Sequence, residues 1–389
     1  MKKLWVRIIL GLVVLVLLIA GGAFFIVSRF TNITPSLGSG GEAEIFLPPG
    51  FEITVFAEGL NGPRFAYVGP DGHLYVADRG NNRVVRLPDN NQDGVADRVE
   101  IVAEDLDRVH SLVFHEGAWY VGVPAGVIRL EDEDGDGTAE SRTTLIDNYL
   151  PPGQHSTRTI EFLPDGRLLV SAGSTCNVCV EEDERRAAVT VYDSPVGQDQ
   201  LTGEQIFATG LRNAVGLAIN PATDELWATN NGRDLMGDDL PPEAIYIVEE
   251  GNNYGWPFCH SGDIVDPDMG SPDSCAGVEP PIATMQAHVA PLGMAFYTGD
   301  TFPEEYHGDL FIALHGSWNR SEPVGYSIVR LPLQNGELMR RPVEDFAIGW
   351  LKEDNSADGR PVDVTVGADG ALYVTDDKGG FVYRIQYDG

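Results

Sequence analysis

Residues 369–385 read DGALYVTDDKGGFVYRI, and this stretch contains the unit that decides the fold. An Asp-Gly turn leads into ALYVTDD, in which apolar and polar residues alternate, and FVYRI follows after a short gap. Alternation built from Val, Tyr, Leu and Ile is typical of half-buried β-strands. The unit therefore predicts two successive strands that follow a tight turn.

The same unit occurs six times along the chain. The other copies begin at the turns Asp71-Gly72, Glu116-Gly117, Asp165-Gly166, Thr223-Asp224 and Gly308-Asp309. Repeats of roughly 40–50 residues with about four short strands each are typical of propeller blades. We therefore expect an all-β fold, a six-bladed β-propeller. A pair of β-sandwiches is the alternative, but it does not explain the recurrence. Propellers carry function in the loops around one mouth of the central channel.

The N-terminus predicts a transmembrane helix. Ile8–Val27 spans 20 positions without a charge, which is about the length of a helix that crosses a bilayer core. Lys2, Lys3 and Arg7 precede it, so we expect the N-terminus to stay in the cytoplasm and the remainder to be exported. A cleaved signal peptide is the alternative, because small residues at 20–23 leave a cleavage site conceivable.

This interpretation divides the chain into three parts. Residues 1–28 are the membrane anchor, residues 29–45 a flexible linker, and residues 46–389 the propeller domain. The propeller of such a single-pass membrane protein would lie outside the cytoplasm, in the periplasm or at the cell surface.

The chain is strongly acidic. It has 26 Lys and Arg against 59 Asp and Glu, a formal net charge of −33. Binding to nucleic acid depends on clustered Lys and Arg that contact phosphates, so we expect no nucleic-acid partner. Hydrophobic residues make up 43% of the chain, which is enough for a packed core and excludes wholesale disorder.

Four cysteines fit an exported domain. Cys176 and Cys179 form a C-x-x-C pair, and Cys259 and Cys275 lie in the long interval between the fourth and fifth units. In an oxidising compartment two local disulfides are the simplest interpretation. A redox-active dithiol at the first pair and a zinc site made by all four are the alternatives.

Two acidic segments have the spacing of calcium-binding loops. In residues 89–100, Asp89, Asn91, Asp93, Asp97 and Glu100 occupy positions 1, 3, 5, 9 and 12, with Gly94 at position 6. Residues 132–143 provide Asp132, Asp134, Asp136 and Glu140 in a similar order, but Thr143 stands at position 12. We expect structural calcium sites in hairpin loops, and two solvated acidic turns are the alternative.

Polar residues recur where loops enter or leave the predicted blades. They are His155 and Arg158, Arg212 and Asn213, Trp318, Asn319 and Arg320, and Arg360 and Asp363. A neutral histidine in such a loop can act as a general base near physiological pH. Several arginines in an acidic chain favour an anionic small molecule as ligand, because the guanidinium binds carboxylates in a bidentate manner. Scattered surface residues are the alternative.

Several strings together give a family resemblance. They are RNAVGLAINP at 212–221, NNGRD at 230–234, PPEAIYIVEEGNNYGWP at 241–257 and APLGMAFYTGDTFPEEYHGDLFIALHGS at 290–317. The chain resembles the soluble glucose, aldose sugar and sorbosone dehydrogenases that depend on pyrroloquinoline quinone (PQQ), over about residues 46–387. STCNVC at 174–179 and HGSWNR at 315–320 are similar to the sorbosone dehydrogenase branch.

The resemblance implies a propeller that holds PQQ and Ca²⁺ at one mouth. It assigns His155 as the general base, Arg212 as the contact to the quinone oxygens, and Asn213 beside it. The backbone of Asn231-Gly232-Arg233 would bind the calcium of the cofactor. Glu243 matches an acidic residue near a second calcium.

The cofactor carboxylates need cations, and here the sequence departs from the family pattern. Arg360 matches the first arginine of an Arg-x-Arg-Asp motif, but Val362 stands at the second, while Asp363 is retained. The family lysine of this region has no clear counterpart. We expect Arg320 to replace the lost cation.

The implied activity is oxidation of a sugar hydroxyl or a sugar-derived aldehyde by hydride transfer to PQQ. Electrons would pass to a cytochrome or quinone acceptor in the membrane or periplasm. Two other functions remain open: a non-catalytic propeller that binds glycans or proteins, and a calcium-dependent hydrolase of the lactonase type. The latter would hold Ca²⁺ by Glu, Asn and Asp side chains inside the channel.

Overall fold

The computed structural model describes residues 34–36, 44–149, 153–339 and 343–389. These residues form strands and two short 3-10 turns, Arg79–Asn81 (η1) and Glu304–Tyr306 (η2). No helix within this part of the chain is long and apolar enough to cross a bilayer. The predicted membrane segment, Ile8–Val27, lies outside the described residues.

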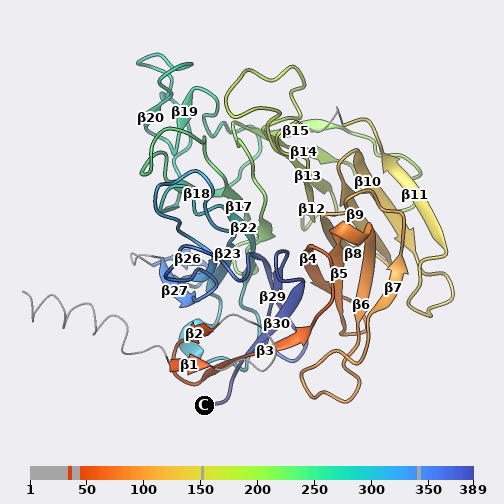
Figure 1. Cartoon of the computed structure of the whole chain (residues 1–389). Coiled ribbons are helices and arrows are strands. Elements are labelled where there is room, and N and C mark those ends of the chain that lie inside the picture. The colour runs from red at the N-terminus through yellow and green to blue at the C-terminus, as the bar shows by residue number, and fades with distance from the viewer. Residues whose placement is uncertain (1–33, 37–43, 150–152, 340–342) are drawn as a thin grey trace, which may run out of the picture.

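In the described residues, six four-stranded sheets follow one another around a ring, which confirms the predicted six-bladed propeller (Figure 1). Blade 1 contains β4 (Pro63–Val68), β5 (Leu74–Asp78), β6 (Arg83–Leu87) and β7 (Glu100–Ala103). Blade 2 contains β8 (Ser111–His115), β9 (Ala118–Val123), β10 (Gly126–Glu131) and β11 (Ser141–Ile146). Blade 3 contains β12 (Arg158–Phe162), β13 (Leu168–Ala172), β14 (Ala188–Tyr192) and β15 (Gln205–Thr209).

The second half of the ring has the same plan. Blade 4 contains β16 (Leu217–Ile219), β17 (Leu226–Asn230), β18 (Glu243–Ile247) and β21 (Ala283–Met285). Blade 5 contains β22 (Pro291–Phe296), β23 (Leu310–Leu314), β24 (Ser327–Leu331) and β27 (Glu344–Ala347). Blade 6 contains β28 (Pro361–Val366), β29 (Leu372–Asp376), β30 (Phe381–Tyr387) and, from the other end of the chain, β3 (Phe51–Ala57). Each sequence unit supplies the second strand of one blade, and the third strand follows it.

The ring closes because its two chain ends share blade 6. β3 pairs antiparallel with β30, so that Ile53 lies opposite Ile385 (Figure 1). The first strand of each blade contacts the first strand of the next, and β28 contacts β4, so six inner strands surround the channel. A closed ring leaves no inner sheet edge open.

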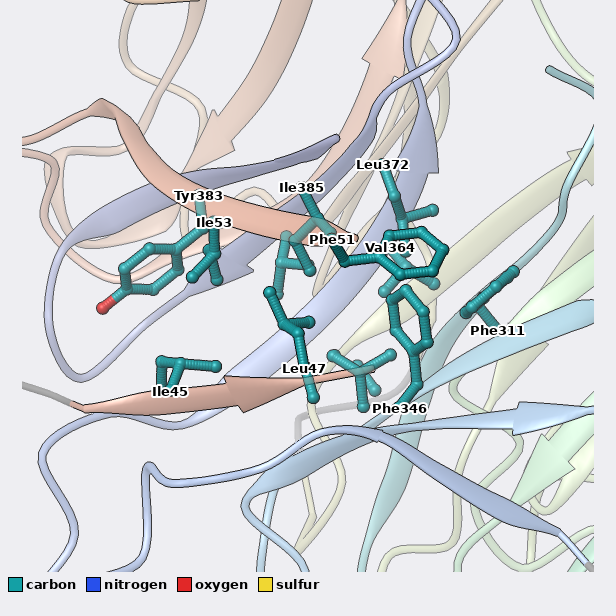
Figure 2. Packing of buried hydrophobic residues seen from close by; sticks show 14 of the residues in the cluster. Ile45, Leu47, Phe51, Ile53, Phe311, Phe346, Val364, Leu372, Tyr383 and Ile385 are labelled. Carbon is teal, nitrogen blue, oxygen red and sulfur yellow. The ribbon is translucent and has the colours of Figure 1, made fainter. Parts of the chain in front are cut away.

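The apolar faces of adjacent blades form the core. Figure 2 shows this packing around β3 in blade 6, where Phe51 lies close to Phe346 and Phe311 of blade 5. The ring centroids of Phe51 and Phe346 are 5.0 Å apart in an edge-to-face arrangement. Such packing of complete apolar faces is what the alternating unit predicts.

Part of the predicted flexible linker is instead paired with the propeller. β1 (Thr34–Ser36) pairs antiparallel with β2 (Ile45–Leu47). The Phe46 backbone exchanges two hydrogen bonds with Ile348, 2.7 and 3.1 Å long, and the Ile45 and Leu47 side chains are buried in the core of Figure 2. The prediction of an unstructured tether is therefore wrong for residues 34–36 and for Ile45. The apolar side chains of Ile45 and Leu47 are buried in the core, which stabilises this strand pair.

Strand direction alternates within each blade, so loops of two kinds share one end of the channel. The loop between the second and third strands and the connection to the next blade both lie at that end, which we call the mouth. The loop between the first and second strands and the loop between the third and fourth strands lie at the opposite face. Two small hairpins, β19 (Cys259–His260) with β20 (Ile264–Val265) and β25 (Leu333–Gln334) with β26 (Glu337–Leu338), belong to third-to-fourth-strand loops. The long loop that carries β19 and β20 is an exception to this placement, because it returns to the mouth, where Ser261 donates to the carbonyl oxygen of Pro242.

Candidate active site at the mouth of the channel

A cavity of about 280 Å³ lies at the mouth, lined by loops from blades 1, 3, 4 and 5. His155, Arg212 and Asn213, all predicted site residues, line it. They come from the connections that enter blades 3 and 4, where an apolar strand begins directly after a polar loop. The ring geometry thus brings together residues that are almost 60 positions apart.

His155 is held as a neutral imidazole whose Nε2 has no hydrogen-bond partner among the described residues. Its Nδ1 lies 2.9 Å from the carbonyl oxygen of Ser174 and 3.0 Å from the Ser174 hydroxyl oxygen. A carbonyl oxygen only accepts, so Nδ1 carries the proton and Nε2 is left as an acceptor. Burial, and then the charge of Arg212, lower the pKa of His155 to about 3. The imidazole therefore stays unprotonated near neutral pH and can accept a proton.

The Arg212 side chain is buried and held in one orientation. Its Nε donates to the carbonyl oxygen of Asn177 at 3.0 Å, and one terminal nitrogen donates to the Asn177 side chain at 2.9 Å. The same nitrogen pairs with Asp234 at 2.7 Å. A guanidinium with so many fixed partners presents its charge to the cavity in one orientation.

Only part of the predicted calcium-binding stretch, residues 231–233, lies at the cavity. Asn231 and Gly232 line the cavity, as does Glu243, whose carboxylate accepts from the Gly232 backbone at 2.6 Å. Burial raises the pKa of Glu243 to about 7. The Arg233 side chain turns instead toward the loop after β18 and pairs with Asp266 and Asp268.

Blade 1 supplies two cationic side chains that the sequence interpretation missed. Arg64 lines the cavity and pairs with Asp377 at 2.6 Å, and its Nε donates to His110 Nδ1 at 3.3 Å. His315, also in the wall, lies 2.9 Å from the other Asp377 oxygen. Burial would raise the pKa of Asp377, but His315 and Arg64 outweigh it and hold this pKa at about 2.

Arg79 is the second of these cations, and it has no carboxylate partner among the described residues. It lines the cavity from η1, and its Nε is buried without a hydrogen-bond partner within the described ranges. Burial, followed by the nearby charges of Arg64 and Arg108, lowers the pKa of Arg79. Arg79 is half-buried, and its charge and its buried Nε–H are both available, so this wall of the cavity is suited to an anionic ligand.

Two predicted cofactor ligands point elsewhere. Arg320 bonds to the carbonyl oxygen of Asp238, and Arg360 donates to the carbonyl oxygens of His315 and Gly316 at 2.9 and 2.7 Å. Neither lines the cavity. Both side chains are instead held by the backbone of neighbouring loops, and their role as cofactor ligands stays a prediction. Of the HGSWNR string, Trp318 and Asn319 do line the cavity, and Trp318 is 67% exposed.

Val362 has a structural explanation. It is completely buried and belongs to the apolar core that contains Val215 and Leu292. A cation at 362 would enter that core, whereas Arg64 and Arg79 reach the cavity from blade 1. Asp363 is buried deeper in the channel, where its carboxylate accepts from the Ala66 backbone at 2.9 Å and burial raises its pKa to about 7.

Both predicted disulfides are present. Cys176 is bonded to Cys179 at the mouth, and Cys259 to Cys275 in the long loop after β18. No described cysteine is free, which excludes a zinc site or a resting dithiol. Arg158 is completely buried beside Tyr149, 5.0 Å from its ring centre, and does not line the cavity.

The two acidic loops lie at the face opposite the mouth, because both join third and fourth strands. In the second loop, ligand oxygens of Asp132, Asp134, Asp136 and Glu140 lie within 4.8 Å of one another. The first loop matches the calcium pattern better in sequence, but Glu100 at position 12 pairs there with Arg86 and Arg98. The other predicted ligands, Asp89, Asn91, Asp93 and Asp97, bond to backbone and side-chain N–H groups of their own loop.

Fold and site together define a class: a six-bladed β-propeller whose mouth holds a neutral histidine among arginines. A sequence model of the Glucose / Sorbosone dehydrogenase family matches residues 122–384, and an NHL repeat model matches residues 60–87. The chain therefore belongs to the Glucose / Sorbosone dehydrogenase family, a family of oxidoreductases.

Individual proteins agree with this membership. An uncharacterised protein of Borreliella burgdorferi is 29% identical over 94% of this chain and 95% of its own length. A pyrroloquinoline quinone-dependent pyranose dehydrogenase of Coprinopsis cinerea is 26% identical over 87% of this chain, but the match spans only 54% of that enzyme. The holo form of the pyranose dehydrogenase PQQ domain from Coprinopsis cinerea superposes with a TM-score of 0.76 at 24% identity, over 90% of this chain and 99% of that chain, which supports the fold.

Proposed function

We propose that this chain is a PQQ- and calcium-dependent dehydrogenase that oxidises a hydroxyl or aldehyde group of a sugar. The single observation that carries this proposal is a neutral His155, its Nε2 unpaired within the part of the chain that the structure describes, beside the fixed charge of Arg212 in one cavity. The pyranose dehydrogenase relative supports the same chemistry.

The residues present fit a polycarboxylated cofactor. PQQ carries three carboxylates, and the cavity offers Arg79 without a carboxylate partner among the described residues, together with Arg64 and Arg212. These three side chains would hold it. When bound, PQQ supplies the two-electron acceptor for sugar oxidation.

The cavity also fits a hard cation beside that cofactor. Asn231 and Gly232 provide carbonyl oxygens, and Glu243 and Asp234 provide carboxylates. Ca²⁺ prefers such an all-oxygen set of ligands. Glu243 would gain most, because a bound cation offsets the cost of burying its charge.

The chain's own residues then have distinct tasks. His155 Nε2 accepts the proton of the sugar hydroxyl, while Ser174 keeps the other ring nitrogen protonated. Arg212 stabilises negative charge that develops near it in the transition state. Trp318 at the rim offers an apolar face to the substrate.

The location of the enzyme belongs to the proposal as well. An anchor at Ile8–Val27 would hold the domain outside the cytoplasm, beside a cytochrome or quinone acceptor in the membrane or periplasm. The two disulfides support an oxidising compartment. Labelling with a reagent that cannot cross the cytoplasmic membrane, applied after the outer envelope is permeabilised, tests this placement. A propeller that is labelled only after the cytoplasmic membrane is lysed would contradict it.

The central experiment is reconstitution. The purified propeller domain is mixed with PQQ and Ca²⁺, and reduction of an artificial dye is followed with a panel of aldoses, sugar alcohols and sorbosone. We expect turnover with at least one sugar and bleaching of the quinone absorbance. Failure to bind PQQ, or binding without turnover of any sugar, would overturn the proposal.

The lactonase-type alternative would use the same Glu243 and Asp234 carboxylates to hold Ca²⁺ in the cavity. It does not explain the arginines that line the same cavity, whereas a polycarboxylated cofactor does. A non-catalytic propeller would not need a histidine tautomer fixed by two hydrogen bonds.

A further inference from the structure

The Cys176–Cys179 disulfide closes a tight loop at the mouth, between β13 and β14. Asn177 lies inside this loop and has no part in the function proposed above. Its backbone and side chain nevertheless make several hydrogen bonds to residues of the site. Those contacts converge on Arg212 and its carboxylate partner.

Asn177 holds Arg212 at two points. Arg212 Nε donates to the Asn177 carbonyl oxygen at 3.0 Å, and an Arg212 terminal nitrogen donates to Asn177 Oδ1 at 2.9 Å. The indole nitrogen of Trp256 donates to the same carbonyl oxygen at 3.3 Å. Arginine has a long, rotamer-rich side chain, and fixing it in one direction requires partners that are themselves fixed.

Asn177 also holds the partner of Arg212. The Asp234 backbone N–H donates to Asn177 Oδ1 at 2.8 Å, and Asn177 Nδ2 donates to the Asp234 carbonyl oxygen at 2.9 Å. The ion pair between Arg212 and Asp234 therefore rests on the same amide. One side chain thus sets the positions of a cation and of its counter-ion.

The disulfide fixes Asn177 from both sides. Cys176 and Cys179 are three positions apart, and the Cys176 carbonyl oxygen accepts from the Ser174 hydroxyl at 2.6 Å. That hydroxyl oxygen in turn contacts His155 Nδ1. The loop is therefore connected to both the base and the cation of the site.

We propose that Asn177, held in the Cys176–Cys179 loop, is a positioning residue for Arg212, and that sugar oxidation depends on the intact disulfide. This inference rests on the proposed function, because Arg212 acts on the bound cofactor there. A dithiol reductant such as dithiothreitol would break the bond by exchange. It would leave two cysteine thiols and become a cyclic disulfide itself.

The first test compares Asn177→Ala with Asn148→Ala, which removes an exposed amide at the same face outside the cavity. We expect Asn177→Ala to lower kcat by roughly tenfold or more, with a smaller change in PQQ affinity and in the sugar KM. Asn177→Asp keeps the acceptor oxygen for Arg212 and the Asp234 N–H but loses the donor to the Asp234 carbonyl oxygen, so it should recover only part of the lost kcat. An Asn177→Ala variant with the kcat of Asn148→Ala overturns the proposal.

The second test uses the disulfide. Dithiothreitol should lower kcat of the wild type and of Cys259→Ala/Cys275→Ala. The variant Cys176→Ala/Cys179→Ala should already be slow and should not respond further. If the latter variant does not fold, the kcat of Asn177→Ala, in which the disulfide is intact, tests the proposal by itself. A wild type indifferent to dithiothreitol after verified reduction of Cys176–Cys179 contradicts the role of the disulfide.

A third readout separates this inference from the proposed function. Crystal structures of the cofactor-free wild type and of Asn177→Ala would show the position of the Arg212 guanidinium directly. We expect it to leave its position in the variant. If the wild type binds no PQQ, the proposed function fails, yet this comparison still tests the positioning role. An unmoved Arg212 overturns it.

Discussion

The two walls of the mouth cavity are built in different ways. The wall from blades 3 and 4 carries His155, Arg212 and Asn213, each held by contacts within neighbouring loops. The wall from blade 1 carries Arg64 and Arg79, and Arg64 depends on Asp377, which is 313 positions away in blade 6. We call the first the chemical wall and the second the anchoring wall.

This difference indicates which wall would bind the negatively charged carboxylates of the cofactor. On the chemical wall the cation already has Asp234 as counter-ion, so its charge is partly satisfied before a ligand arrives. On the anchoring wall Arg79 has no such partner among the described residues. An anionic ligand therefore gains more from the anchoring wall, whereas proton transfer belongs to the chemical wall.

The largest expected effect separates the walls directly. His155→Ala removes the base of the chemical wall and should lower kcat by roughly 10²–10⁴-fold, since this is the usual contribution of a positioned general base. PQQ binding, measured by quenching of protein fluorescence, should persist. Because burial and Arg212 hold the pKa of His155 at about 3, the wild type should lose this base only as the pH falls toward that value. The control is His73→Ala on the opposite face, and equal rates in both variants would remove His155 from this role.

Arg79→Ala tests the anchoring wall. We expect PQQ affinity to fall by roughly ten- to a hundredfold, because a charge-assisted hydrogen bond to a cofactor carboxylate is lost. The melting temperature should change little, since Arg79 is only half-buried and has no carboxylate partner among the described residues. Isothermal titration measures the affinity, with Arg108→Ala, whose side chain pairs with Asp107 at the rim, as control. Unchanged affinity in Arg79→Ala would mean that the two walls do not differ as described.

Glu243 gives a pH-dependent test of the chemical wall. Burial raises the pKa of Glu243 to about 7 in the folded protein, whereas in the unfolded chain it ionises near its ordinary value. Its contribution to the free energy of unfolding is therefore present below about pH 4.5 and is lost as the pH rises through 7. In calcium-free buffer, wild type should lose up to roughly 2–3 kcal/mol relative to Glu243→Gln between pH 4.5 and 8. Urea unfolding at several pH values measures this, and parallel curves for the two proteins would contradict it.

The smallest expected effect concerns Arg320. Its guanidinium is held by backbone carbonyls and does not line the cavity. Arg320→Ala should therefore change PQQ affinity by less than about twofold, well below the effect of Arg79→Ala. A loss comparable to that of Arg79→Ala would show that the loop rearranges when the cofactor binds.

Local patterns in the sequence determined much of this protein. Alternation of apolar residues after a tight turn is a property of single strands, so six copies were enough to predict six blades. The disulfides followed from exported context and spacing. His155, Arg212 and Asn213 could be selected because each stands in a loop directly before an apolar strand, within strings similar to a known family.

Only the tertiary structure decided which arginines meet at the cavity. Arg64 lies in β4 and Arg79 follows β5, without any distinguishing string. Arg64 is oriented by Asp377 of blade 6, a contact that exists only because the ring closes between blades 6 and 1. Arg320 and Arg360 stand in promising strings, yet nearby carbonyl oxygens hold them away from the cavity. The direction of a long charged side chain depends on partners that are distant in sequence, whereas strand alternation depends on neighbours, and this is why the fold was predictable and the ligand set was not.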